Sequence, residues 1–337
     1  MKLCLRRAAT LATVGLTSCG GGRGGPTAPT APSSPTPPAS LHAVTASVYY
    51  DANRNNAVDP GESVRLGDVV LQIGGVSGRT DAEGGRAVVQ GVPAGTHTIA
   101  VQVSSLPPFF VPGAPITIEV PRGDEVSVPV ALPIGQNTPF RYLASGDSIS
   151  QGVGSDNDTG YRRALQSTLS GHYGVSISMF YRGGGGGTSD DGAARIARDL
   201  TLLDPAYTLI GWGTNDWNGC GEPTSCGTVA NLRSLVRSVK AADSLPCVAT
   251  ILPPNVGYDS LAPESRARWV VEMNELIKAM ALQEGALLVD LHAAFMRAGP
   301  SGLFVDHVHP NSRGYEVIAE AWFEALTRPR GASAAAD

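Results

Sequence analysis

The chain has 337 residues, 42% of them hydrophobic, and a formal net charge of −5. This length and apolar content allow two folded domains with sizeable cores, and an acidic chain without a basic cluster argues against nucleic acid as a partner. Glycine (41 residues) and proline (25 residues) are plentiful, so part of the chain must be linker or turn-rich β structure.

The N-terminal segment, residues 1–18, has the pattern of an export signal. A positively charged start precedes an apolar run over residues 8–16, which is too short to span a bilayer. The run ends in Leu-Thr-Ser-Cys, which resembles the bacterial lipobox, where cleavage precedes a cysteine that then carries lipid. We therefore expect a lipoprotein signal peptide over 1–18 and lipidation at Cys19. Plain secretion with cleavage nearby is the alternative.

Residues 19–42 consist mainly of Gly, Pro, Thr, Ser and Ala after Cys19. Such a composition cannot bury a core and predicts a disordered linker. Removal of the signal takes away three positive charges and changes the formal charge from −5 to −8. The expected location is the bacterial cell envelope, on a periplasmic or surface-facing side, with membrane contact through the lipid anchor only.

Residues 43–134 contain short alternating apolar runs separated by turn residues, without a helical period. Six or seven such strands predict a small β-sandwich. The motifs at 48–55, 61–62, 80–84 and 92–97 resemble the B-type immunoglobulin-like repeats of bacterial surface proteins.

One loop of this segment has oxygen-bearing residues at the spacing of a calcium loop. Positions 1, 3, 5, 7, 9 and 12 of an EF-hand-like pattern are Asp51, Asn53, Asn55, the Ala57 carbonyl, Asp59 and Glu62. Position 6, usually glycine, is Asn56, which also tolerates a left-handed turn. We expect a structural calcium site of modest affinity, with a metal-free Asn/Asp turn as the alternative.

From residue 138 to 329 predicted strands alternate with helical periods. Five successive β-α units predict a parallel sheet covered by helices on both faces, so the expected fold class is a three-layer α/β/α sandwich preceded by a small all-β domain. Strands are expected at 140–144, 175–181, 207–212, 247–252 and 286–291. Residues 330–337 are expected to form a disordered tail.

Three strand ends carry candidate chemistry, since ligands in such folds bind at the carboxyl ends of strands. The first strand leads into Gly-Asp-Ser at 146–148, where Ser148 is either a nucleophile or an ordinary helix cap. The second leads into a glycine run at 183–187, which is either a flexible loop or a set of N–H donors for an oxyanion. The third leads into Asn215, whose amide is a candidate oxyanion donor, and Asp216, a structural hydrogen-bonding residue of that loop.

The loop before the last helix contains Asp306 and His309, three residues apart. On a turn, this spacing can supply a general base and its orienting carboxylate. His307 adds the possibility of zinc, but the remaining histidines offer no further ligand, so no chemical role is expected for it.

In combination, the four blocks resemble the SGNH (GDSL-type) hydrolases over residues 139–326. The resemblance implies a flavodoxin-like fold, with Ser148 as nucleophile, His309 as general base and Asp306 as its orienting carboxylate. It also implies three oxyanion donors: the Ser148 main-chain N–H, the Gly186 N–H and the Asn215 side chain.

This chain departs from the family pattern in one residue, and its glycine run leaves the register open. Tyr181 stands where many members have asparagine, and five consecutive glycines make Gly185 the alternative donor to Gly186.

The expected reaction is ester hydrolysis through an acyl-serine, which needs no cofactor. The pattern at residues 160–165 is similar to that of members that remove acetyl groups from plant polysaccharides, so the expected substrate is an acetylated polysaccharide or oligosaccharide. Lipase, arylesterase or thioesterase activity is the alternative within the family. A surface lipoprotein that only binds glycans is the alternative from another class.

Cys220 and Cys226 lie six residues apart in a loop rich in Gly, Pro and Thr. In an exported chain this predicts a local disulfide, because a metal pair would need the Cys-x2-Cys spacing and further ligands nearby. Cys247 lies in an apolar run and is expected to be buried.

Overall fold

The computed structural model describes residues 40–331, all of which belong to one compact unit. The predicted signal peptide at 1–18, the lipidation at Cys19, the linker up to residue 39 and the tail from residue 332 lie outside the described residues. Leu41 and His42, assigned to the linker, instead begin a β-strand, because they pair with Pro93 and Val92. Among residues 40–331, no helix has both the length and the hydrophobicity needed to span a bilayer.

The all-β region consists of two four-stranded sheets. One sheet has the order β4-β1-β8-β6 and the other β3-β2-β5-β7; all pairs are antiparallel except β1 with β8. Apolar side chains alternate along the strands and fill a common core, as in Val44, Ala46 and Val48 of β1. The strands are β1 (Leu41–Tyr50), β2 (Val70–Ile73), β3 (Val76–Arg79), β4 (Arg86–Pro93), β5 (Gly95–Val101), β6 (Val111–Pro112), β7 (Ile116–Val120) and β8 (Val126–Ala131). The relation to the B-type immunoglobulin-like repeats stays a prediction.

The predicted calcium loop follows β1, and its side chains are held together by hydrogen bonds within the loop. The Asp51 carboxylate accepts the N–H groups of Asn55 and Asn56 at 3.2 and 2.8 Å, and Asn56 has the expected left-handed conformation with φ 61°. The Glu62 carboxylate accepts the N–H groups of Ala52 and Asp59 at 2.8 and 3.1 Å. Within residues 40–331, no group of three or more His, Cys, Asp or Glu side chains has the arrangement of a metal site. Calcium binding therefore stays a prediction.

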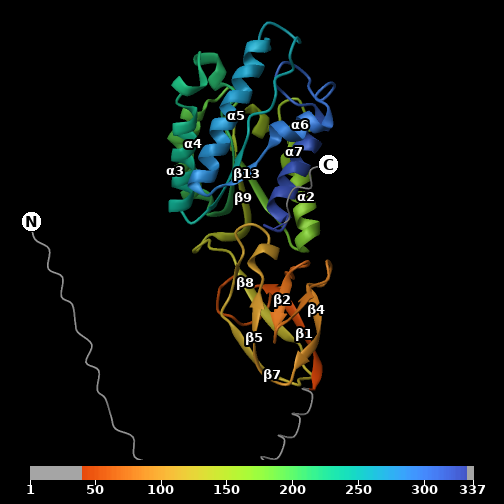
Figure 1. Cartoon of the computed structure of the whole chain (residues 1–337). Helices are drawn as coiled ribbons and strands as arrows, with labels where there is room; N and C mark the ends of the chain where they lie inside the picture. The colour runs from red at the N-terminus through yellow and green to blue at the C-terminus, as the bar shows by residue number, and fades with distance from the viewer. Residues whose placement is uncertain (1–39, 332–337) are drawn as a thin grey trace, which may run out of the picture. The chain divides into compact units, whose positions relative to one another are not determined.

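The second region confirms the expected three-layer α/β/α architecture. Its five parallel strands have the order β10-β9-β11-β12-β13, which is the 2-1-3-4-5 order of flavodoxin-like sheets. Helices α3, α4 and α5 cover one face of the sheet, and α2, α6 and α7 cover the other (Figure 1). The strands are β9 (Thr138–Gly146), β10 (Ser178–Gly183), β11 (Pro205–Gly211), β12 (Leu245–Ala249) and β13 (Leu287–Val289). The helices are α1 (Ser148–Gln151), α2 (Tyr161–Tyr173), α3 (Ser189–Leu203), α4 (Thr228–Ala241), α5 (Glu264–Glu284), α6 (Leu291–Ala298) and α7 (Ser312–Thr327).

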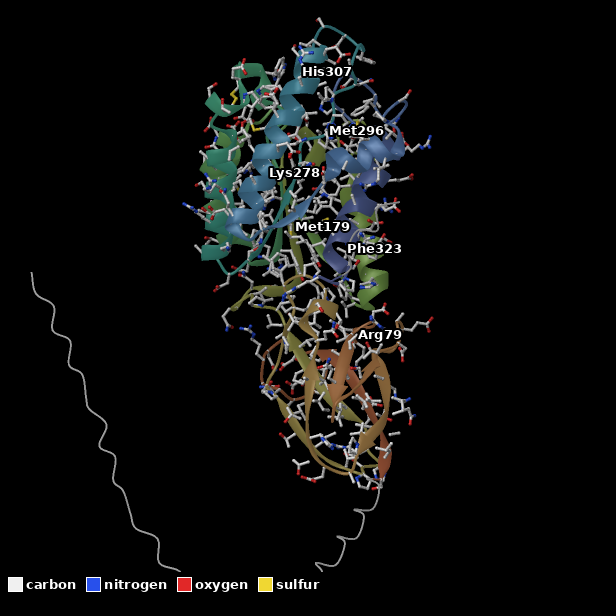
Figure 2. All side chains as sticks on the ribbon, viewed as in Figure 1. Arg79, Met179, Lys278, Met296, His307 and Phe323 are labelled. Carbon is white, nitrogen blue, oxygen red and sulfur yellow. A yellow bond between two sulfur atoms is a disulfide. The ribbon has the colours of Figure 1, made fainter. Side chains whose placement is uncertain are left out.

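Both faces of this sheet are buried, because successive side chains of each strand point in opposite directions. Along β9, Tyr142 and Ala144 belong to one hydrophobic cluster and Leu143 to another. Met179 of β10 and Phe323 of α7 pack against the first cluster and are marked in Figure 2. That cluster also contains the buried residues of the all-β region, so the two cores are continuous.

Two features differ from the sequence-based expectation at the end of the chain. Helix α6 was not predicted, because a segment of eight residues is too short to show a clear helical period in the sequence. The helix begins where Asp290 Oδ1 accepts the Ala293 N–H at 3.0 Å. Arg330 and Gly331, assigned to the tail, donate main-chain hydrogen bonds to the Leu106 and Ser104 carbonyls at 3.1 and 2.7 Å.

Candidate active site

Three strand ends lie side by side at the carboxyl edge of the parallel sheet. Gly146, the last residue of β9, pairs with Gly183 of β10 and Gly211 of β11. A Cβ at Gly183 would come 1.7 Å from the Gly146 carbonyl oxygen, and a Cβ at Gly146 would come 2.6 Å from that of Gly211. Glycine is therefore required at both positions. Because the three strand ends are paired in register, the loops that follow them all begin at the same edge of the sheet.

Ser148, His309 and Asp306 form one hydrogen-bonded chain. His309 Nε2 lies 2.8 Å from Ser148 Oγ, and its Nδ1 lies 2.6 Å from Asp306 Oδ2. Asp306 Oδ1 accepts the main-chain N–H groups of Val308 and His309 at 2.9 and 2.7 Å, so the three-residue spacing closes a turn. This is the arrangement of a nucleophile, a base and the group that orients the base.

The electrostatics of Asp306 favour its charged form. Burial alone would raise the pKa of this carboxyl, but hydrogen bonds from the N–H groups of His309 and Val308 and from the His309 ring hold the pKa below its usual value. An ionised Asp306 selects the tautomer with hydrogen on His309 Nδ1, which leaves Nε2 free to accept the Ser148 proton.

Asn215 lies against the glycine loop that follows β10. Its side-chain amide donates to the Gly187 carbonyl at 2.9 Å, and a second amide hydrogen can serve a ligand. Gly186 has φ 72°, and a Cβ there would meet no atom within 4 Å. A Cβ at Gly185 would lie 3.5 Å from Gln151 Oε1. The loop is thus open at both glycines, and the choice of Gly186 over Gly185 stays a prediction.

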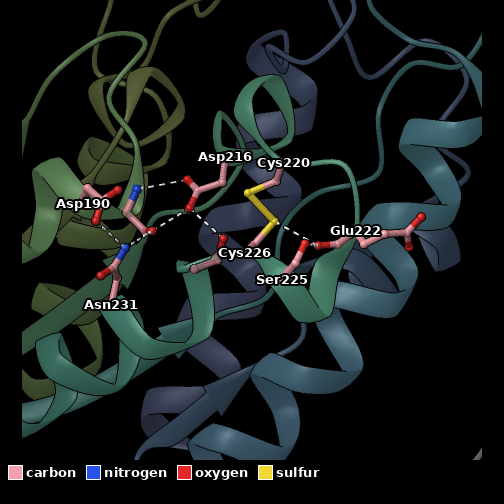
Figure 3. The surroundings of a disulfide bond; sticks show 9 residues. Asp190, Asp216, Cys220, Glu222, Ser225, Cys226 and Asn231 are labelled. Atoms are coloured by element: carbon pink, nitrogen blue, oxygen red, sulfur yellow. Dashed lines mark hydrogen bonds between the residues drawn. A yellow bond between two sulfur atoms is a disulfide. The ribbon is translucent and has the colours of Figure 1, made fainter.

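A buried carboxylate holds the Asn215 loop, as Figure 3 shows around Asp216. Asp216 Oδ1 accepts the Ser189 and Thr228 hydroxyls at 2.5 and 2.7 Å, and Oδ2 accepts the Ser189 N–H at 3.0 Å. Asn231 adds a hydrogen bond to Ser189 Oγ at 2.9 Å. Asp216, which directly follows Asn215, therefore ties this loop to the first turns of α3 and α4. This agrees with the structural role expected for Asp216.

A disulfide joins Cys220 and Cys226, whose Cα atoms lie 5.6 Å apart (Figure 3). It closes a loop within the segment from Asp216 to Thr228, whose two ends are joined by the hydrogen bond from the Thr228 hydroxyl to Asp216. Cys247 is fully buried, as expected.

Tyr181, the departure from the family pattern, braces the turn that carries the serine. Its hydroxyl donates to the Asp147 carbonyl at 3.3 Å, and the Arg162 guanidinium lies over its ring at 5.1 Å from the centroid. Arg162 also donates to the Gln151 carbonyl at 2.7 Å. These contacts connect β10, α1 and α2 around the nucleophile turn.

Two residues next to the site were missed by sequence reasoning. Asn255 donates from its main chain to the His307 carbonyl at 2.9 Å and from its side chain to the Asp306 carbonyl at 3.0 Å. Arg266, 3% exposed, donates to the Thr214 carbonyl at 3.1 Å and to the Leu261 carbonyl at 2.9 Å. Both contact main-chain carbonyls, which every residue offers, so no sequence pattern marks them.

His307, labelled in Figure 2, does not join the chain formed by Ser148, His309 and Asp306. Its Nδ1 lies 3.3 Å from Asp259 Oδ2 on the neighbouring loop. The absence of a chemical role for His307 stays a prediction.

The model of the GDSL-like lipase/acylhydrolase family matches residues 144–317. Similar solved structures include TesA, which is 27% identical, with 55% of this chain and 97% of that chain covered and a TM-score of 0.47. A catalytic mutant of Axe2, an acetylxylan esterase from Geobacillus stearothermophilus, is 22% identical, with 58% and 98% covered and a TM-score of 0.49. The psychrotrophic esterase EstA from Pseudoalteromonas sp., inhibited by monoethylphosphonate, is 23% identical, with 56% and 96% covered and a TM-score of 0.45. The search of curated proteins found no match.

Proposed function

The chain belongs to the GDSL-like lipase/acylhydrolase family, and on that premise we propose that it is a serine ester hydrolase that works through an acyl-enzyme. The observation that carries the proposal is the 2.8 Å contact between His309 Nε2 and Ser148 Oγ, with Asp306 on the far side of the ring. A serine hydroxyl at neutral pH needs such a base to attack an ester.

In the first half of the reaction, His309 accepts the Ser148 proton while Oγ attacks the ester carbonyl carbon. The negative charge on the carbonyl oxygen would be held by the Ser148 N–H, the Gly186 N–H and the Asn215 amide. The imidazolium then gives its proton to the departing alcohol, and Asp306 stabilises the charged ring meanwhile.

In the second half, His309 takes a proton from a water molecule, which attacks the acyl-serine. Collapse of the second tetrahedral intermediate returns the proton to Ser148 and releases the carboxylic acid. All proton transfers use one imidazole, so the mechanism needs no cofactor.

An active-serine phosphonate probe tests the proposal directly. The purified chain should form a covalent adduct at Ser148, and the Ser148→Ala variant should neither label nor hydrolyse nitrophenyl acetate. Ser234→Ala, which removes an exposed serine of α4, serves as the control and should behave like the wild type. A chain that does not label would instead be a glycan-binding protein without activity.

For the substrate, we propose an ester of a carbohydrate, most simply an acetate. In the motif at 160–165 that suggested this class, Tyr161 and Leu165 are buried, whereas Arg163 is exposed and lines a groove of about 330 Å³ between α2 and α7. The groove is rich in hydroxyl groups and contains one anionic side chain. Besides Arg163, its polar lining residues are Ser155, Asn157, Ser167, Ser312, Tyr315 and Glu316. This lining supports a hydroxylated ligand better than an alkyl chain.

Part of the groove lining adjoins the loop that carries His309. Gly154, the neighbour of Ser155, is so close to the His309 loop that a Cβ on it would come 3.4 Å from His309 Cβ. A hydrolysis panel of acetylated xylan, short-chain nitrophenyl esters, long-chain esters and acyl thioesters tests the substrate. Preference for long-chain esters would favour a lipase. Preference for nitrophenyl esters would favour an arylesterase, and preference for thioesters would favour a thioesterase.

Export and anchoring rest on the sequence alone. We propose that the mature chain begins at a lipidated Cys19 and resides in the bacterial cell envelope. Metabolic labelling with a fatty acid should mark the wild type in a bacterial host and leave Cys19→Ser unmarked.

A further inference from the structure

A small buried cavity of about 30 Å³ lies beneath the turn that carries Ser148. Asp147 and Trp322, each 1% exposed, line it from the end of strand β9 and from helix α7, which belong to adjacent layers of the fold. Within the described residues, Asp147 Oδ2 and Trp322 Nε1 have no hydrogen-bond partner. Most of the other lining side chains are apolar, among them Ile149, Ile251 and Ile318.

Two such atoms at one cavity call for a ligand. A buried carboxylate oxygen or indole N–H without a hydrogen-bond partner costs on the order of 1–3 kcal/mol of folding stability. Such unpaired buried groups are rare in native proteins. Burial also raises the pKa of Asp147 to about 6, although the Ile149 N–H, His309 and the Thr214 side chain, which also lines the cavity, lower it. One atom is an acceptor and the other a donor, so a single small molecule able to accept and donate would satisfy both.

The size of the cavity selects that molecule. A site needs roughly 10–15 Å³ of probe volume and at least two polar partners to hold one water molecule. The observed cavity of about 30 Å³ meets both conditions and is too small for an acyl chain or a sugar. We propose that it is a binding site for ordered water that accepts the Trp322 indole N–H and donates to Asp147 Oδ2, and that Asp147, held in this way, is a positioning residue for Ser148.

The positioning role follows from the other contacts of Asp147 and rests on the proposed function of Ser148. Asp147 Oδ1 accepts the Ile149 N–H at 2.9 Å, which begins α1, and the Asp147 carbonyl accepts the Tyr181 hydroxyl at 3.3 Å. These two bonds flank the peptide that presents the Ser148 N–H and Oγ. Water on Oδ2 fixes the remaining freedom of the carboxyl group, so the turn has one orientation.

The water itself is tested on the wild-type chain with ¹⁵N-labelled tryptophan. The Trp322 indole N–H should show a nuclear Overhauser effect to a long-lived water molecule, and a missing cross-peak would overturn the proposal. This readout does not depend on hydrolysis, so a missing water and a wrong proposed function can be told apart. Failure of the proposed function would instead appear as unchanged hydrolysis by Ser148→Ala.

The positioning role is tested by Trp322→Phe, which keeps an aromatic ring but removes the donor. We expect kcat to fall about tenfold, the loss for one ordinary hydrogen bond, with KM unchanged within about twofold. Trp269→Phe is the matched control, because Trp269 Nε1 is equally buried without a partner but lies on α5, away from this cavity. It should leave kcat unchanged. Equal kcat in Trp322→Phe and the wild type, or equal losses in both variants, would refute the positioning role.

Discussion

His309 Nε2 lies 2.8 Å from Ser148 Oγ, although 161 residues separate the two in the chain. The contact exists because Ser148 follows the strand β9 near the centre of the sheet, whereas His309 lies in the loop that leads into α7, which covers the same sheet. Its chemical value depends on Asp306, which is part of the same loop as His309.

Replacing Asp306 by Asn should lower kcat by about 10³–10⁴-fold while leaving the fold intact. The amide can no longer select the tautomer with hydrogen on Nδ1, so Nε2 ceases to be a good acceptor for the Ser148 proton. Steady-state hydrolysis of a short nitrophenyl ester measures the loss, with circular dichroism as the control for folding. Activity within about tenfold of the wild type would contradict the role assigned to Asp306.

Asp147 and Asp306 should affect stability with opposite dependence on pH. The pKa of Asp306 is lowered in the folded state, so its contribution is present above the ordinary value of 3.8 and is lost as pH falls further. The pKa of Asp147 is raised from 3.8 to about 6, so stability should fall as pH rises through that interval. Urea unfolding between pH 3 and 8 measures both effects. Asp147→Asn should abolish the decline between pH 4 and 6, and an unchanged slope in that variant would refute the assignment.

The candidate residues at the strand ends could be predicted because the topology of a parallel sheet is itself predictable. Ser148 and Asn215 each follow a strand that is recognisable as a buried apolar run, and the carboxyl ends of parallel strands meet at one edge. His309 and Asp306 were found because their spacing suits a turn. Their grouping with Ser148 was predicted from the order of the elements together with the resemblance to the SGNH hydrolases, without knowledge of side-chain packing.

The supporting contacts could not be predicted in this way. Arg266 and Asn255 bond to main-chain carbonyls, and their position depends on the path of the loop before α5. The unpartnered oxygen of Asp147 meets the cavity only because Trp322 packs there from α7. In the glycine run, residues without side chains provide no pattern from which a register could be assigned.

Removal of the disulfide should weaken the Asn215 loop. The double variant Cys220→Ser/Cys226→Ser opens the segment between Asp216 and Thr228, and closing a loop of this length contributes about 2 kcal/mol to stability. We expect a lower melting temperature and a severalfold lower kcat. A reductant should destabilise the wild type and have no effect on the double variant. Equal sensitivity of both proteins would show that the disulfide does not hold this loop.

A calcium chelator should leave ester hydrolysis unchanged, because the proposed mechanism uses only side chains and main-chain N–H groups of the α/β region. If the loop from Asp51 to Glu62 binds calcium, the chelator should lower the melting temperature, and added calcium should restore it. Asp59→Ala, which removes one predicted ligand, should melt at a temperature that no longer responds to calcium. A melting temperature insensitive to calcium in the wild type would remove the metal site, and loss of hydrolysis with chelator would contradict the mechanism.

Asp216 should act on catalysis through Asn215, which a double-mutant cycle can show. Asn215→Ala removes a candidate oxyanion donor and should reduce kcat by about 10²–10³-fold with little change in KM. Asp216→Asn loses a strong acceptor for the Ser189 and Thr228 hydroxyls, so it should let the Asn215 loop move and reduce kcat by a smaller factor. If Asp216 works by holding Asn215, its replacement should have almost no further effect in the Asn215→Ala background.

Thr208→Val, which breaks a buried hydroxyl pair with Ser244 elsewhere on the sheet, is the control for a purely structural loss and should leave kcat unchanged. Additive losses from Asn215→Ala and Asp216→Asn would mean that Asp216 does not act through the oxyanion donor.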